Sequence, residues 1–467
     1  MPPEASSPQP QLAIVGAGLA GCALAAQLTQ LGWPAPITLW EAGRGPGGRA
    51  STRHSRHDPQ RRADHGAPLL TITTDPPPAL LAPLLAGGWI EPWPEPCARL
   101  DASGALQPIG PEPLLQGSRY RGRGGMEQVC AGLLALAGAG CTLHSSRLIQ
   151  RLEPRAGGGW RLLCGDGEHL ADADWLVLSG TLLVHPRGRA LLGAAPAPLA
   201  ALAAGDPQLA AALRVIATLG AEPCSNLIWQ LEGAAAEPWL ALPFRLLEFE
   251  AGAQHRWGLR RVSIQPGAQG RCAVVAHSSA ALAADHLQTV GSGSAAVQLP
   301  GVKLDPEREQ ALIAQLTVAV QAALAAWLPE ATGQPPAGER QLMRWSAAFP
   351  RGEGLPADLS LCAHSRLAFC GDYLTGPGFG RAEGAWRSGE HLAERLMGLL
   401  SPPGTPAVGT TSGLGEAAEA HEASAEATGE AAKANEASAT ATAGGRRSSS
   451  AWNARPDTAA RGRQDNG

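Results

Sequence analysis

The residues with the clearest chemistry form a glycine-rich loop near the N-terminus, which joins an apolar run at 12–15 to an apolar stretch at 19–31. Gly16 can make a tight turn, Gly18 lets the backbone approach a pyrophosphate, and Gly21 lets a helix pack closely on a strand. The free N–H groups at the start of such a helix attract the anion. The predicted contacts with a dinucleotide are Gly16, Ala17, Gly18, Leu19, Ala20 and Gly21.

A carboxylate follows this loop at the spacing that dinucleotide binding requires. A second apolar run, 37–40, leads into Glu41, about 20 residues after Gly21. In this position a carboxylate accepts hydrogen bonds from the hydroxyls of the adenosine ribose. This order, a strand, the glycine loop, a helix, a second strand and an acid, therefore predicts a dinucleotide-binding unit. Ala42 is included among the predicted contacts.

The next segment distinguishes a flavin dinucleotide from a nicotinamide dinucleotide. Residues 44–52 place Gly47 and Gly48 between two arginines, Arg44 and Arg49. The glycines allow close passage of the backbone, and Arg49 can neutralise a pyrophosphate or hold the loop. The segment resembles the motif that follows the glycine loop in flavin-containing amine oxidases and in glutathione-reductase-like proteins. This resemblance implies FAD as the cofactor, bound without a covalent link.

A second motif lies far along the chain and agrees with the first. An apolar strand ends at Gly371 and Asp372, and Glu383, Gly384 and Ala385 open the last helix. In the FAD proteins that this pattern resembles, the acid reaches the ribityl chain or the pyrophosphate region, and the helix start points at the flavin. A helix N-terminus suits the negative charge of a reduced flavin.

The resemblance narrows to the renalase family. Residues 57–60 and 63–67 are similar to the H-x-P-Q and A-D-x-G-A core of that family, although an aromatic residue of the family is replaced within 68–70. The resemblance implies hydride transfer from dihydronicotinamide (NAD(P)H) isomers to FAD, with O2 reoxidising the flavin to give H2O2. It also implies a p-hydroxybenzoate-hydroxylase-like fold. Its further cofactor contacts are Gly66, Ala67 and Ile149.

Two other functions remain open on the same scaffold. One is oxidation of an amine or desaturation of a lipid-like substrate, and the other is flavin binding with little turnover. Amine oxidases of this fold usually keep a lysine near the flavin N5, whereas the only lysines here are Lys303 and Lys433. Lysine scarcity therefore weighs against an amine oxidase.

No side chain stands out as an obligatory acid or base, which is consistent with a cofactor that carries the chemistry. His277, at the end of an expected strand, and Trp386, at the start of the last helix, are the hypothesised pocket residues. No spacing of His, Asp, Glu or Cys predicts a metal site.

Composition excludes several classes of partner and compartment. Among 467 residues, 44% are hydrophobic and 17% charged, and the formal net charge of −4 predicts no nucleic-acid partner. Nine cysteines without a C-x-x-C pair predict reduced thiols in a cytoplasmic protein. No basic residue precedes Arg44, so a secretory signal is not expected, and no apolar run is long enough to predict a membrane span.

Two long helices are expected in the second half of the chain. One follows Asp305 and Pro306, an N-cap residue and a first-turn proline. The other occupies about 384–400, with Leu399 among its inward residues and Glu390 among its outward residues.

The order of elements predicts an α/β protein. Its Rossmann-type FAD-binding domain is interleaved with an α+β substrate domain, and an Ala/Glu/Ser/Thr-rich C-terminal tail is expected to be disordered. The expected ranges are 11–75, 124–185 and 362–400 for the FAD domain, 76–123 and 186–361 for the substrate domain, and 401–467 for the tail.

Overall fold

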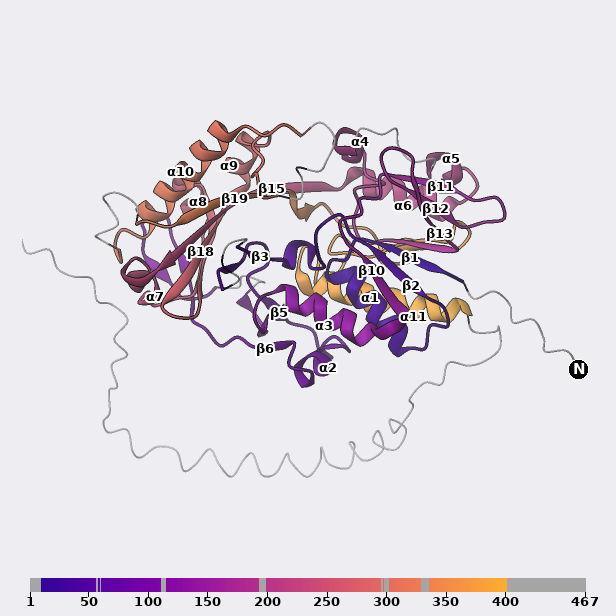
Figure 1. Cartoon of the computed structure of the whole chain (residues 1–467), viewed down its shortest axis with the longest axis horizontal. Helices are drawn as coiled ribbons and strands as arrows, with labels where there is room; N and C mark the ends of the chain where they lie inside the picture. The colour runs from indigo at the N-terminus through magenta and orange to yellow at the C-terminus, as the bar shows by residue number, and fades with distance from the viewer. Residues whose placement is uncertain are drawn as a thin grey trace, which may run out of the picture. The chain divides into compact units, whose positions relative to one another are not determined.

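The computed structural model describes residues 10–55, 58, 60–110, 115–192, 199–294, 297, 302–328 and 336–400. The predicted tail, and two residues of the renalase-like segment, His57 and Pro59, lie outside these residues. Figure 1 shows the described elements, which group around one mainly parallel sheet and one mainly antiparallel sheet. The elements on each sheet are called the parallel-sheet lobe and the antiparallel-sheet lobe.

The parallel-sheet lobe is built on six strands in the order β10-β2-β1-β14-β21-β20. All neighbouring strands are parallel except β21 and β20. Leu12 at the start of β1 pairs with Ile37 on one side and Trp175 on the other, which places the glycine loop at the carboxyl end of the central strand. The strands are β10 (Cys141–His144), β2 (Ile37–Trp40), β1 (Leu12–Val15), β14 (Trp175–Leu178), β21 (Leu367–Phe369) and β20 (Leu361–Cys362).

Different layers cover the two faces of this sheet (Figure 1). On one face, α1 packs against both α3 and α11 over an apolar core that includes Leu24, Val129 and Leu392. On the other face, a three-stranded antiparallel sheet and α6 enclose a core around Trp160. These elements are α1 (Leu19–Gln30), α3 (Glu127–Ala137), α6 (Pro207–Thr218), α11 (Ala382–Leu400), β11 (Arg151–Pro154), β12 (Trp160–Leu163) and β13 (His169–Ala173).

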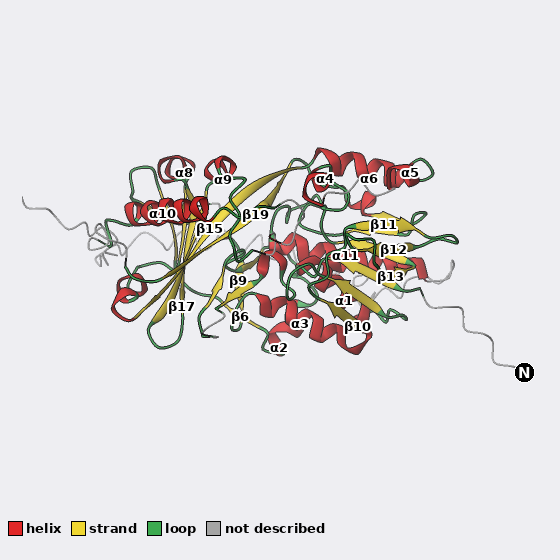
Figure 2. Cartoon of the chain, turned by 45° about the horizontal axis from the view of Figure 1, so that its top comes forward, coloured by secondary structure: helices red, strands yellow, loops and turns green. Residues whose placement is uncertain are grey.

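The antiparallel-sheet lobe contains seven strands in the order β19-β15-β18-β17-β16-β7-β8, of which only β16 and β7 pair in parallel. Helix α10 buries Leu312, Leu316 and Val320 in the core of this lobe, and Figure 2 shows α8, α9 and α10 along one side of the sheet. The elements are β19 (Glu339–Arg351), β15 (Gly220–Glu232), β18 (Arg271–Ser278), β17 (Leu259–Pro266), β16 (Leu246–Phe249), β7 (Cys97–Leu100), β8 (Leu106–Gln107), α8 (Ala251–Trp257), α9 (Ala280–Asp285) and α10 (Pro306–Ala323).

A short hairpin, formed by β3 (Thr52–His54) and β4 (Arg62–Asp64), connects the lobes. Ala63, the middle residue of β4, is buried against Ile228, Val275 and their neighbours on the antiparallel sheet. The hairpin follows the double-glycine segment directly, so contacts with this sheet help to position that segment. The remaining elements are β5 (Leu70–Ile72), β6 (Ile90–Pro92), β9 (Ser118–Gly122), α2 (Leu81–Ala86), α4 (Arg187–Leu192), α5 (Leu199–Ala203) and α7 (Glu237–Leu240).

The predicted α/β class is confirmed, whereas two details of the last helix were wrong. Glu390 is buried, because its carboxylate accepts hydrogen bonds from the backbone N–H groups of Ala79 and Leu80 near the start of α2. Leu399 is 47% exposed, since it lies in the last turn of α11 beyond the core. Helix α10 begins as predicted, with the Asp305 carboxylate capping the Arg308 N–H at 3.1 Å.

Among the described residues, the structure contains no helix with the length and hydrophobicity that crossing a bilayer requires.

Candidate functional site

Glycine is required at both ends of the loop between β1 and α1. Gly16 has a φ of +104°, and a Cβ at this position would lie 2.5 Å from the Ser179 hydroxyl oxygen. A Cβ on Gly21 would lie 2.2 Å from the Gly16 carbonyl oxygen. The first turn of α1 therefore packs directly on the end of β1, as the sequence predicts.

The middle glycine, Gly18, has a different environment. Apart from its chain neighbours and the nearby backbone, no atom lies within 4 Å of the place that its Cβ would occupy. Gly18 is the N-cap of α1, no side chain caps this end, and the first turn, from Leu19 and Ala20 onward, contains no acidic residue. The N–H groups of the first turn of α1 are therefore not capped by a side chain.

Glu41 connects the glycine loop to the segment that follows β2. One carboxylate oxygen accepts a hydrogen bond from the Ala17 N–H at 2.9 Å, and the other accepts one from the Gly43 N–H at 2.6 Å. The Glu41 carbonyl also accepts a hydrogen bond from the Arg147 N–H, which brings the chain leading to Ile149 alongside. Ala42 is half-buried and Arg44 is exposed.

The two glycines of the next segment pack on the first loop. The Gly47 N–H donates to the Ala17 carbonyl at 2.8 Å, and Gly47 forms a bridge with Gly18. A Cβ on Gly48, whose φ is +54°, would lie 3.3 Å from the Gly18 Cα. The two glycine motifs therefore form one continuous backbone surface around Gly18.

Arg49 and Asp372 come from opposite ends of the folded chain and form a bidentate ion pair. The two terminal guanidinium nitrogens of Arg49, Nη1 and Nη2, each lie 2.6 Å from a carboxylate oxygen of Asp372. Arg49 also donates to the Ala348 carbonyl on β19 at 2.8 Å. The Asp372 carboxylate is buried, whereas the Arg49 side chain is 41% exposed. Its neighbour Gly371 donates its N–H to the Ser388 hydroxyl.

The Gly66–Ala67 segment runs directly along the backbone of Arg49. The Ala67 N–H donates to the Arg49 carbonyl at 2.8 Å. A Cβ on Gly66 would lie 1.9 Å from the same oxygen, so only glycine permits this contact. These residues are thus brought beside the double-glycine motif, and their contact with the cofactor stays a prediction.

The start of α11 is fixed by its buried carboxylate. The Glu383 carboxylate accepts four hydrogen bonds, from the backbone N–H groups and the hydroxyls of Thr73 and Thr74, and pairs with Arg381 at 3.0 Å. Burial alone would raise the pKa of Glu383, but these hydrogen bonds outweigh it and lower the pKa. Gly384 packs on Gly378, whose carbonyl oxygen a Cβ would approach to 2.0 Å, and Ala385 follows in the first turn. The Glu383 carboxylate is therefore occupied by protein donors.

Two buried histidines lie where the hairpin meets the antiparallel sheet. His277 on β18 donates from Nε2 to the His65 carbonyl at 3.1 Å, and the Asn226 amide donates to the same oxygen. The His65 ring stacks on Trp345, with ring centroids 5.5 Å apart. Burial lowers the pKa of His65 to about 4 and that of His277 to about 3. Both rings are therefore neutral at physiological pH.

The structure places Trp386 and Ile149 in cores. Trp386 is fully buried, and its indole N–H donates to the Glu390 carboxylate at 2.8 Å. Ile149 packs with Leu152 and Trp160 on the other face of the parallel sheet. Both side chains are buried, and the roles predicted for them, Trp386 in the pocket and Ile149 as a cofactor contact, stay predictions.

The structure also brings three metal-ligand types together at an exposed turn between β12 and β13, where the sequence predicts no metal site. Cys164, Asp166 and Glu168 lie within 4.8 Å of one another. The Cys164 thiol and the Glu168 N–H both donate to the Asp166 carboxylate, which explains the cluster as a turn.

Comparison with protein families decides the class of this protein. Residues 112–397 match the model of flavin containing amine oxidoreductases, and residues 14–82 match an NAD(P)-binding Rossmann-like domain. The chain belongs to the flavin-containing amine oxidoreductase family. This flavoenzyme is an FAD-dependent oxidoreductase, which confirms the predicted enzyme class and cofactor.

Solved structures of similar fold agree with the family. A triple mutant of putrescine oxidase is 12% identical with a TM-score of 0.52, covering 84% of this flavoenzyme and 99% of that chain. Wild-type putrescine oxidase bound to putrescine is 12% identical with a TM-score of 0.50, at coverages of 84% and 99%. A putative protoporphyrinogen oxidase from Exiguobacterium sp. 255-15 is 14% identical with a TM-score of 0.53, covering 83% and 98%. A search of curated proteins found no match.

Several contacts of the flavoenzyme were not predicted from its sequence. They are the Ala348 carbonyl bonded to Arg49, the Ser179 hydroxyl behind Gly16, and the Asn226 amide bonded to His65. Each lies more than 150 residues from its partner and belongs to no recognisable motif, so the sequence offers no signal for it.

Proposed function

We propose that this flavoenzyme oxidises dihydronicotinamide isomers in a renalase-like reaction. Its FAD would accept a hydride from the substrate, and O2 would reoxidise the cofactor to give H2O2. We further propose that residues 11–75, 124–185 and 362–400 form the FAD domain, and that 76–123 and 186–361 form the substrate domain.

The open surface around Gly18 supports a position for the FAD pyrophosphate. The uncapped start of α1 offers a positive dipole end there, and the double-glycine segment keeps side chains away from the same surface. Glu41 lies at the end of β2, where its carboxylate would exchange the Ala17 or Gly43 N–H for ribose hydroxyls. The exposed part of Arg49 supplies a positive charge on the same path.

The Gly66–Ala67 segment and the start of α11 would contact the flavin ring. Arg49 holds the first segment through its carbonyl, and Glu383 holds the second by binding Thr73 and Thr74. A helix start at the ring stabilises the negative charge that FAD acquires on reduction. His277 acts here as a positioning residue, because it holds the carbonyl of His65 immediately before Gly66.

The low pKa values of the two buried histidines are the observation that most favours a dihydronicotinamide. Removing a proton at neutral pH requires a group whose pKa lies near that pH. His65 and His277 have pKa values of about 4 and 3. The only lysine among the described residues, Lys303, precedes α10 in the antiparallel-sheet lobe, and α10 covers the face away from the hairpin. A dihydronicotinamide gives up a hydride without losing a proton to the protein, whereas a protonated amine must first be deprotonated.

Amine oxidation is the second candidate, because the family and the structural similarity to putrescine oxidase favour it. Oxygen consumption separates the two proposals. Dihydronicotinamide isomers are expected to yield one H2O2 per substrate molecule oxidised, without release of ammonia or an aldehyde. H2O2 formation from amines alone would favour the amine oxidase.

A further inference from the structure

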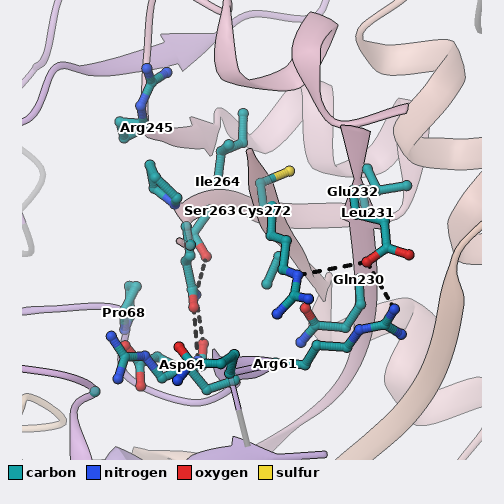
Figure 3. Close-up of a pocket in the computed structure, with 18 of the residues that line it drawn as sticks. Arg61, Asp64, Pro68, Gln230, Leu231, Glu232, Arg245, Ser263, Ile264 and Cys272 are labelled. Atoms are coloured by element: carbon teal, nitrogen blue, oxygen red, sulfur yellow. Dashed lines mark hydrogen bonds and ion pairs between the residues drawn. The ribbon is translucent and has the colours of Figure 1, made fainter. Parts of the chain in front are cut away.

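A cavity of about 450 Å³ lies between the hairpin and the antiparallel sheet. Arg62 and Asp64 line it from β4, and the Gly122–Gly125 turn lines it from the start of α3. Figure 3 shows Gln230, Ser263 and other sheet residues on the opposite wall.

The cavity is separate from the proposed cofactor contacts but adjacent to them in the chain. None of the proposed FAD contacts lines it. Asp64 forms part of its wall, and Gly66, which packs on Arg49, is two residues further on. Two residues of extended chain span at most about 7 Å, a distance that a ribose phosphate can bridge. A substrate can therefore occupy the cavity with one end and reach the proposed flavin position with the other.

Most guanidinium groups of this cavity are already paired. Arg61 and Arg271 both pair with Glu232, at 2.9 and 3.7 Å, as Figure 3 shows for Arg61. Arg121 pairs with Glu91 at 2.7 Å. The Arg245 guanidinium donates to three backbone carbonyls and reaches Glu95 only at 4.0 Å.

Arg62 is different from these four arginines. In the described part of the chain, its guanidinium makes no hydrogen bond and no ion pair, and it lies 3.3 Å from the place where a Cβ on Gly124 would be. Its carboxylate neighbour Asp64 already accepts hydrogen bonds from the Thr52 hydroxyl and the Met126 N–H. Arg62 therefore offers free N–H donors to the cavity, and the nearest charge to it is the Asp64 carboxylate, with which it interacts electrostatically.

Part of the cavity wall is apolar, although the carboxylates of Glu95, Glu232 and Glu339 also line it. Pro68, Trp93 and Leu246 contribute apolar surface. The Arg119 guanidinium lies over the Trp93 ring, 5.5 Å from its centroid. A molecule with an anionic end and a less polar body can place its anion at Arg62 and its body against this apolar surface.

We propose that this cavity binds the phosphate end of a dihydronicotinamide mononucleotide, with Arg62 as the phosphate ligand. This inference rests on the proposed function and adds the substrate class to it: an anionic substrate rather than a polyamine. A charge-assisted contact between guanidinium and phosphate gives affinity and fixes the end of the substrate farthest from the flavin.

Direct binding is tested with inorganic phosphate and the FAD-loaded protein by titration calorimetry. We expect the wild-type protein to bind phosphate, and Arg62→Gln to weaken binding about tenfold or more. Arg123→Gln is the matched control, because Arg123 is 63% exposed, pairs with Glu91 and does not line the cavity. Equal phosphate binding by the wild-type protein and Arg62→Gln would overturn the proposal, as would no binding at all.

A matched pair of substrates tests the position of the phosphate. Dihydronicotinamide mononucleotide and dihydronicotinamide riboside contain the same reactive ring and differ by one phosphate. We expect the concentration for half-maximal anaerobic bleaching of the flavin to be about tenfold lower for the mononucleotide, and Arg62→Gln to remove this difference without changing the value for the riboside. Equal values for both compounds would overturn the cavity assignment alone. Bleaching by neither compound would overturn the proposed function, and the substrate assignment with it.

Discussion

At the scale of single residues, the ion pair between Arg49 and Asp372 carries most of the order around the double-glycine segment. Asp372 is buried and accepts two short hydrogen bonds from one guanidinium. Removing the negative charge leaves Arg49 with a weaker partner, while the Ala348 carbonyl continues to hold one of its nitrogens. The geometry of the segment therefore depends on a carboxylate more than 300 residues away.

We expect Asp372→Asn to lower the free energy of unfolding by about 1–3 kcal/mol, measured by urea denaturation, and to weaken retention of FAD. Asp305→Asn is the control, since asparagine caps a helix about as well as aspartate does. Equal stability of Asp372→Asn and the wild-type protein would show that the ion pair contributes little.

The buried histidines predict a dependence of stability on pH. The ordinary pKa of histidine is about 6.5, whereas in the folded protein that of His277 is about 3 and that of His65 about 4. Between these values only the unfolded chain binds the proton, so stability is fully present above pH 6.5 and is lost as the pH falls toward 4. Each histidine contributes about 1.4 kcal/mol per pH unit.

We therefore expect His277→Gln to reduce the slope of unfolding free energy against pH, between pH 4 and 6, by about 1.4 kcal/mol per unit. Urea denaturation at several pH values measures this slope. A slope identical to that of the wild-type protein would mean that His277 is protonated in the folded state.

At the scale of elements, the position of α11 depends on a carboxylate at its first turn. Glu383 binds both Thr73 and Thr74, so the helix start and the chain after β5 move as one piece. We expect Glu383→Gln to destabilise the protein by about 1–3 kcal/mol and to increase hydrogen exchange at the two threonine amides, because the glutamine N–H2 would face donors. Glu394→Gln, on the exposed face of the same helix, should change neither. Unchanged exchange in Glu383→Gln would contradict this role.

The contact between α1 and β1 allows a second test at this scale. Gly21→Ala places a methyl group 2.2 Å from the Gly16 carbonyl oxygen and must displace the helix start. We expect this variant to lose FAD during gel filtration, as measured by the ratio of flavin to protein absorbance. Gly398→Ala, in α11 with no atom within 4 Å of the added carbon, should retain FAD and be slightly more stable. Full retention of FAD by Gly21→Ala would contradict the proposed position of the pyrophosphate.

At the scale of the whole molecule, the sequence predicts what is local and does not predict what joins distant segments. The glycine loop, β2 and Glu41 are within about 30 residues of one another, so their spacing alone indicates a Rossmann unit. The pairing of Arg49 with Asp372, and of Asn226 with the His65 carbonyl, depends on tertiary packing that one sequence does not encode in any pattern.

Contacts between distant segments also explain why some residues lie in an environment other than the one predicted from the sequence. Trp386 is beside a glycine motif in sequence, but its place on α11 turns it into the core beside Glu390. Glu390 looks like a surface residue until the start of α2 supplies two N–H groups for it. The cavity at Arg62 is also absent from any motif, because hairpin and sheet residues more than 150 positions apart form it.

The proposed function requires that a hydride moves from a dihydronicotinamide to the bound flavin. The measurement that tests this most directly is anaerobic mixing of the FAD-loaded protein with dihydronicotinamide isomers and, separately, with amines such as putrescine, while flavin absorbance is followed. We expect the isomers to bleach the flavin stoichiometrically, amines to leave it unchanged, and admission of O2 to restore the colour. Bleaching by an amine alone would contradict the proposed function.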